Sequence, residues 1–95
     1  MSDDELLALA AKAINGGTWH PLTHEMLWNP LTDDGDALRL LVVIGAGLNT
    51  SHPETLCFSS KIDVSEPHSS DKFSATRRAI VKVAAAIGAA TKGQK

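Results

Sequence analysis

Residues 32–45 read TDDGDALRLLVVIG, and this stretch decides which fold the chain can adopt. Its opening, TDDGD, is typical of a helix start, because carboxylates are stabilised at the positive end of a helix. The body from Ala37 to Ile44 carries one charge and is otherwise apolar on all sides, so we expect a helix that is buried on more than one side. Gly45 and Gly47 end it. The β-branched tail 42–44 also favours a strand, so helix and strand are alternatives there.

The elements on either side of this stretch give the fold class. Before it, Ser2 and Glu5 form a capping box for a helix over residues 3–15, and an ordered loop with both tryptophans fills residues 16–31. After it, short β-prone runs at 48–51 and 55–60 predict a hairpin, followed by a half-buried edge strand at 62–65 and a helix over 71–91. The expected order is therefore α-α-β-β-β-α. It is an α+β fold, a small two- or three-layer α/β sandwich with an antiparallel sheet of about three strands.

Two further expectations concern which side chains form the core. Alanine is the commonest hydrophobic residue, so the largest pieces of the core should be the four aromatics, Trp19, Trp28, Phe58 and Phe73. A core this thin often leaves an apolar face that a second copy of the chain completes, which favours a homo-oligomer. In the last helix we expect an inward stripe, and opposite it an outward one. The inward stripe is Phe73, Thr76, Ile80, Val83 and Ile87, and the outward stripe is Arg78, Lys82, Ala85, Ala89 and Lys92.

Length and charge exclude several classes of protein. Ninety-five residues predict one domain over 1–95, and a net charge of −2 makes nucleic acid an unlikely partner. A single cysteine, Cys57, excludes a disulfide framework and suits a reducing compartment. No apolar run is long enough to span a membrane, and the acidic start is unlike a signal peptide. We therefore expect a cytoplasmic protein with no membrane partner.

Candidate metal and catalytic residues are few. Asp33, Asp34 and Asp36 resemble a cation site, but they lack the spacing of an EF-hand and fit the start of a helix better. His20 and His24 have a spacing that could bind a metal, although Pro21 between them interrupts a helix. No nucleophile motif or phosphate-binding loop is present. The sequence therefore predicts neither an enzyme nor a bound metal or cofactor.

Basic residues in the last helix are the less ordinary feature. Arg77 and Arg78, with Lys72 and Lys82, give this helix a basic face. Guanidinium groups suit phosphate, but they also pair with carboxylates. The basic face is therefore a phosphate site, a solvated surface, or the partner of the acidic cluster, with Arg77 pairing Asp33 or Asp36.

Two segments, WNPLTDDGDALRL at 28–40 and ATRRAIVK at 75–82, resemble a family of small phage and prophage proteins. It is the phage alpha-beta-alpha sandwich domain family, related to the NinX-like proteins. The resemblance implies a small α/β sandwich in the cytoplasm of a bacterial host, and it implies no activity. It draws attention to two patches as the places where a partner or ligand would bind, and their residues are Trp28, Asn29, Asp33, Asp34, Asp36, Arg77 and Arg78.

Three functions follow as hypotheses. The first is a non-enzymatic accessory module that binds a host or phage protein, with a homo-oligomer as its expected assembly. The second is a nucleotide-binding protein in which Trp28 stacks on the base and Arg77 and Arg78 hold the phosphate. The third, and the least favoured, is a metal-dependent hydrolase that uses His20, His24 and the acidic cluster.

Overall fold

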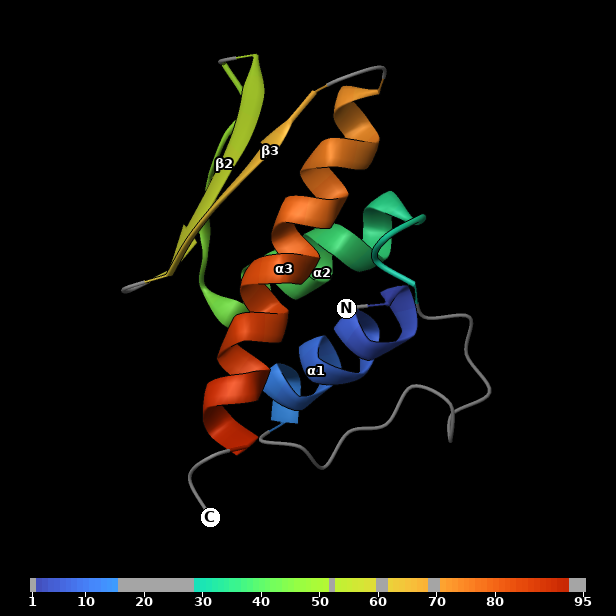
Figure 1. Ribbon diagram of the computed structural model, residues 1–95, viewed down its shortest axis with the longest axis vertical. Helices are drawn as coiled ribbons and strands as arrows, with labels where there is room; N and C mark the ends of the chain where they lie inside the picture. Colours follow the sequence, from blue (N-terminus) through green and yellow to red (C-terminus); the bar gives the residue numbers. More distant parts are fainter. Residues whose placement is uncertain (1, 16–28, 52, 60–61, 69–70, 93–95) are drawn as a thin grey trace.

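Helix α3, Lys72–Lys92, runs through the middle of the molecule, with the sheet on one side and the helices α1 and α2 on the other (Figure 1). The computed structural model describes residues 2–15, 29–51, 53–59, 62–68 and 71–92. The other elements are α1 (Asp3–Asn15), α2 (Asp34–Ile44), β1 (Gly47–Asn49), β2 (Glu54–Ser59) and β3 (Ile62–Pro67). This order confirms the predicted α-α-β-β-β-α fold, in three layers.

Helix α1 begins at the predicted capping box. The backbone N–H of Ser2 donates to Glu5 Oε1 at 2.9 Å, and the N–H of Glu5 donates to Ser2 Oγ at 3.2 Å. The helix then packs on α3 through Leu6 and Ala10. At this crossing Gly88 lies against the backbone of α1, because a Cβ on Gly88 would come within 1.8 Å of the Leu9 carbonyl oxygen. The two helices approach this closely only because residue 88 has no side chain.

Helix α2 includes the whole stretch 42–44, which settles the choice between helix and strand. Its N-cap is Asp33, whose side chain accepts a hydrogen bond from the Asp36 N–H at 2.7 Å. At the other end Gly45 adopts the left-handed conformation (φ 66°), and the Ala46 N–H donates to the Leu41 carbonyl at 3.2 Å. This cap satisfies carbonyls of the last turn, so the β-branched tail completes the helix.

The sheet is antiparallel, with the order β1-β2-β3. Alternation along β2 turns Thr55 and Cys57 toward α3, where both are fully buried. Phe58 points to the outer face and covers Gly47 of β1, where a Cβ would lie 2.3 Å from the Phe58 ring. Strand β3 is half-buried at alternate positions, as expected of an edge strand.

The core is built from aliphatic side chains and alanine, with Leu40, Val81 and Val83 among its largest fully buried members. The expectation that the aromatics form its largest pieces is wrong for the two that the structure describes. Phe58 is 46% exposed and Phe73 is 66% exposed. Trp19 and Trp28 lie outside the described residues.

Two predicted faces of the helices also need correction. Ala85 is buried rather than outward, because α3 is covered on two sides, by the sheet and by the other helices. Helix α2, in contrast, is less covered than its apolar sequence suggests, since Leu38, Val42 and Val43 are 60%, 70% and 56% exposed. Within the described part of the chain no element packs over these three side chains. No helix found there is long and apolar enough to cross a lipid bilayer.

Candidate functional site

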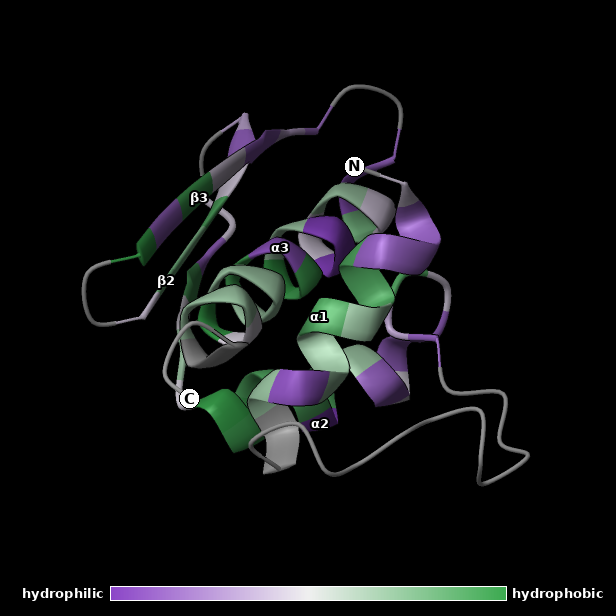
Figure 2. Cartoon of the chain, turned by 60° about the horizontal axis from the view of Figure 1, so that its bottom comes forward, coloured by the Kyte–Doolittle hydropathy of each residue, from purple (hydrophilic) through white to green (hydrophobic). Residues whose placement is uncertain are grey.

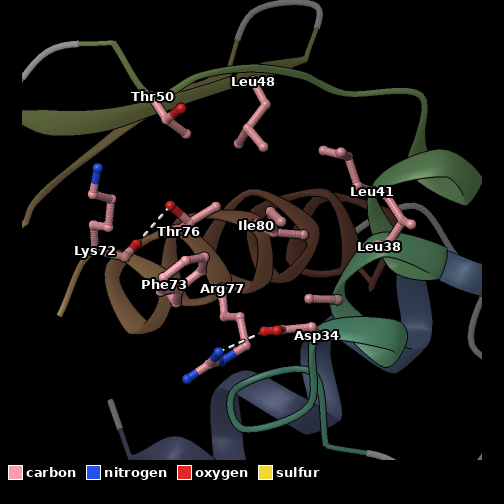
Figure 3. A pocket seen from close by; sticks show the side chains of 11 residues that line it. Asp34, Leu38, Leu41, Leu48, Thr50, Lys72, Phe73, Thr76, Arg77 and Ile80 are labelled. Carbon is pink, nitrogen blue, oxygen red and sulfur yellow. Dashed lines mark hydrogen bonds and ion pairs between the residues drawn. The ribbon is translucent and has the colours of Figure 1, made fainter.

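A hollow of about 260 Å³ opens between α2, β1 and the first half of α3 (Figure 3). Its floor and walls are mostly apolar side chains from all three elements. Figure 3 shows these side chains converging on the space from β1 above, from α2 at the right and from α3, which crosses the centre of the view. The lining residues are Asp34, Ala37, Leu38, Leu41, Leu48, Thr50, Lys72, Phe73, Thr76, Arg77 and Ile80.

Half of the large hydrophobic side chains that are exposed among the described residues lie at this hollow. Leu38, Leu48 and Phe73 line it and are also among the exposed large hydrophobics. Val42 lies one helical turn beyond Leu38, on the same side of α2. In Figure 2 the C-terminal end of α2 is coloured hydrophobic, and the rest of the helix lies mostly behind α1. We call the set Leu38, Val42, Leu48 and Phe73 the apolar rim.

Arg77 links α3 to the turn before α2 and to the first turn of α2, at the base of the hollow. Its Nε donates to the Leu31 carbonyl oxygen at 2.8 Å, and its Nη1 forms an ion pair with Asp34 Oδ1 at 2.6 Å. The Arg77 side chain is only 17% exposed, whereas the Asp34 side chain is 75% exposed. Arg77 therefore fixes the turn before α2 onto α3, and Asp34 still faces solvent at the edge of the hollow. The predicted partners Asp33 and Asp36 do not pair with Arg77.

The remaining residues of the acidic cluster have local roles at the start of α2. Asp36 Oδ2 accepts the backbone N–H of Asn29 at 2.8 Å, and its Oδ1 pairs with Arg39 at 2.8 Å. The Asn29 side chain accepts the Leu31 N–H at 3.0 Å, while Asp33 is the N-cap. These bonds build the turn that leads into the helix. Of the predicted site residues, only Asp34 and Arg77 line the hollow, and Trp28 lies outside the described residues.

The basic face of α3 is largely paired within the fold. Arg78 forms an ion pair with Asp3 of α1 at 3.2 Å, and Lys82 pairs with Glu66 of β3. With Arg77 bound to Asp34, three of the four basic side chains have carboxylate partners. Lys72 is exposed at the edge of the hollow and forms no salt bridge with any described residue.

A buried polar network joins the sheet to α3, and the sequence analysis did not find it. Thr76 Oγ1 donates to the Lys72 carbonyl at 2.7 Å, and Thr55 Oγ1 lies 2.8 Å from Thr76 Oγ1 and 2.7 Å from His68 Nε2. The consistent arrangement has His68 donate to Thr55 and Thr55 donate to Thr76. Thr55 is 0% exposed, so a substrate has no access to its hydroxyl. The sequence contains one signal for this network: the strand alternation that turns Cys57 inward also buries the polar Thr55.

Cys57 and the metal candidates offer no further chemistry. Burial raises the pKa of the Cys57 thiol from its usual 9.0 to about 11, so the reactive thiolate is suppressed at neutral pH. Among the described residues no group of three or more His, Cys, Asp or Glu side chains could hold a metal ion. His20 and His24 lie outside those residues.

Comparisons with protein-family models, with curated proteins and with solved structures found no match to this chain. The resemblance to the phage alpha-beta-alpha sandwich family therefore stays a prediction from the segments 28–40 and 75–82.

Proposed function

We propose that this chain is a non-enzymatic protein-binding module, of the kind that a phage or prophage encodes as an accessory protein. The site is the hollow with its apolar rim. One observation carries the proposal: three large hydrophobic side chains from three elements, Leu38, Leu48 and Phe73, stand exposed around one concave, mostly apolar space. A contiguous apolar patch of several hundred Å² is typical of a surface that contacts another protein.

The polar groups around the hollow fit a protein partner better than a nucleotide. A phosphate held by Arg77 would have to displace both Asp34 and the Leu31 carbonyl, and Arg78 is paired with Asp3. Most of the walls offer apolar contact, and the donors of Lys72 and Thr50 lie among exposed residues of the lining. An apolar segment of a protein, by contrast, needs only to remove water from the rim. No described feature favours the nucleotide hypothesis over the protein one.

Site-specific photocrosslinking tests this proposal. A benzophenone amino acid replaces Phe73 at the rim or, as the matched control, Asp63 on the outer face of the sheet, and bacterial cells that express the protein are irradiated. We expect protein adducts from position 73 and few from position 63. Adduct formation at 73 should be lost with Leu38→Glu and kept with Phe58→Glu. Equal adduct formation at both positions, or none at 73, would overturn the proposal.

A further inference from the structure

We propose that the occupant of the hollow is a second copy of this chain, and that the protein is a two-fold symmetric dimer in which Phe73 of each subunit enters the hollow of the other. The inference rests on the proposed function in one respect, that the hollow is a protein-docking site. Three features of the surface around the hollow support a self-complementary contact: its shape, its area and the charges at its edge.

The shape combines a projection and a recess on one face. Phe73 lines the hollow but is 66% exposed, so its ring stands at the edge of the space rather than filling it. In a two-fold contact, residue i meets residue j and j meets i, so a projection beside a recess satisfies both subunits at once. A cavity of about 150 Å³ already accommodates a benzene ring. The hollow of about 260 Å³ therefore has room for one phenyl side chain.

The exposed area matches what a stable dimer needs. With about 150–250 Å² for a large side chain, the exposed fractions of the apolar rim amount to roughly 400 Å² of apolar surface per subunit. Apolar atoms make up about 60% of an ordinary interface, so an interface of that composition that covered the whole rim would bury roughly 700 Å² of each subunit. That is close to the value of about 800 Å² per partner that specific interfaces bury.

The charges at the edge of the hollow are of both signs. Lys72, at the start of α3, forms no salt bridge with any described residue, and the Asp34 side chain is 75% exposed even though it contacts Arg77. In the symmetric contact Lys72 of one subunit faces Asp34 of the other, and the same pair recurs across the axis. Exposed pairs of this kind contribute little affinity, but they select the orientation in which the subunits meet.

Analytical ultracentrifugation over a wide concentration series tests the inference. The wild-type chain should sediment at twice its 10.1 kDa mass. Leu38→Glu, which places a charge in the contact, should raise the dimer dissociation constant about tenfold or more. Phe58→Glu, which changes an exposed hydrophobic residue on the outer face of the sheet, should leave the constant unchanged. Circular dichroism checks that each variant is folded, and Val42→Glu replaces Leu38→Glu if that variant is not.

Each other outcome overturns the dimer. A wild-type monomer at every concentration does so, and so does a dimer that Phe58→Glu weakens as much as Leu38→Glu. The proposed function fails on a different result, which is equal adduct formation at positions 73 and 63 or none at 73. If the wild-type chain is a monomer but the benzophenone at position 73 still captures another protein in a Leu38-dependent way, the docking site stands and only the identity of its occupant is wrong.

Discussion

At the residue scale, the absence of a side chain at Gly88 allows α1 and α3 to approach each other closely. A Cβ at this position would meet the Leu9 carbonyl oxygen at 1.8 Å, and that atom belongs to the backbone of α1, which cannot move without moving the helix. Alanine favours a helix by about 1 kcal/mol over glycine, but forced overpacking costs about 1–3 kcal/mol or more. We therefore expect Gly88→Ala to lower the free energy of unfolding by about 2 kcal/mol, measured by urea denaturation.

Gly35→Ala is the matched control. There the nearest atom to the added Cβ is Asp33 Oδ2 at 3.2 Å, the N-cap oxygen, which would have to move by only a few tenths of an ångström. The free energy of unfolding should change by less than about 1 kcal/mol. If Gly88→Ala were as harmless as Gly35→Ala, the close approach of α1 and α3 would be wrong.

Burial of the Cys57 thiol makes the free energy of unfolding depend on pH. Burial favours the neutral thiol and raises its pKa to about 11 in the folded chain, against 9.0 for an exposed thiol. The folded state therefore holds the proton more tightly, so this contribution to stability is complete below pH 9 and is lost as the pH rises toward 11. Two pKa units correspond to about 3 kcal/mol.

The measurement compares the wild-type chain with Cys57→Ala. Both variants contain the same lysines and arginines, so their other titrations cancel in the difference. The difference between their free energies of unfolding should fall by about 2–3 kcal/mol from pH 8 to pH 11. A constant difference across this range would show that the thiol is not buried.

At the scale of the element, the N-cap of α2 is provided by a single side chain. Asp33 accepts the Asp36 N–H at 2.7 Å and so satisfies one of the unpaired donors of the first turn. Asp33→Ala should lower the free energy of unfolding by about 1 kcal/mol in urea denaturation. Asp63→Ala, an exposed change on β3, should stay within about 0.5 kcal/mol. Equal losses in the two variants would mean that Asp33 stabilises the fold no more than an exposed carboxylate does, and that its cap contributes nothing.

The same caps explain which parts of the fold could be predicted from the sequence. The capping box of Ser2 and Glu5, the N-cap Asp33 and the C-cap Gly45 each form hydrogen bonds to residues only a few positions away. Helix starts and ends are therefore encoded locally and were predicted closely. The coverage of a helix face depends instead on distant elements. That is why Phe73, placed inward by its helical spacing, proves exposed in the first turn of α3.

The candidate site was predictable to a smaller extent for the same reason. Asp34 and Arg77 were singled out from their chemistry, and the structure brings them together across 43 positions of the chain. The apolar rim was missed, because Leu38 and Val42 look like core residues in any sequence pattern. Only the packing of α2 against α3 shows which of its apolar sides faces solvent.

At the scale of the whole molecule, the described elements are layered so that none of them covers one side of α2. Helix α3 is buried because the sheet packs on one side and α1 and α2 on the other (Figure 1). Helix α2 packs against α3 with one face, and its outer apolar face has no described neighbour. A small chain of this design has enough apolar surface for a core and for one interface, which is the physical basis of the dimer proposed above.

Charge exchange between subunits tests the orientation of that dimer. Lys72→Glu places two carboxylates opposite each other in a symmetric dimer, and Asp34→Lys places two ammonium groups there, so each variant alone should associate more weakly than the wild-type chain. Mixing the two variants restores an opposite charge at both contacts of the mixed dimer. We expect the mixture to form a heterodimer at concentrations where each variant alone is a monomer, measured by native mass spectrometry with one chain isotopically labelled. Asp34→Lys also removes the ion pair with Arg77, whose side chain is only 17% exposed, and places a second cation beside it, so circular dichroism first checks that the variant is folded. If the mixture associates no better than its components, Lys72 and Asp34 do not face each other and the proposed orientation is wrong.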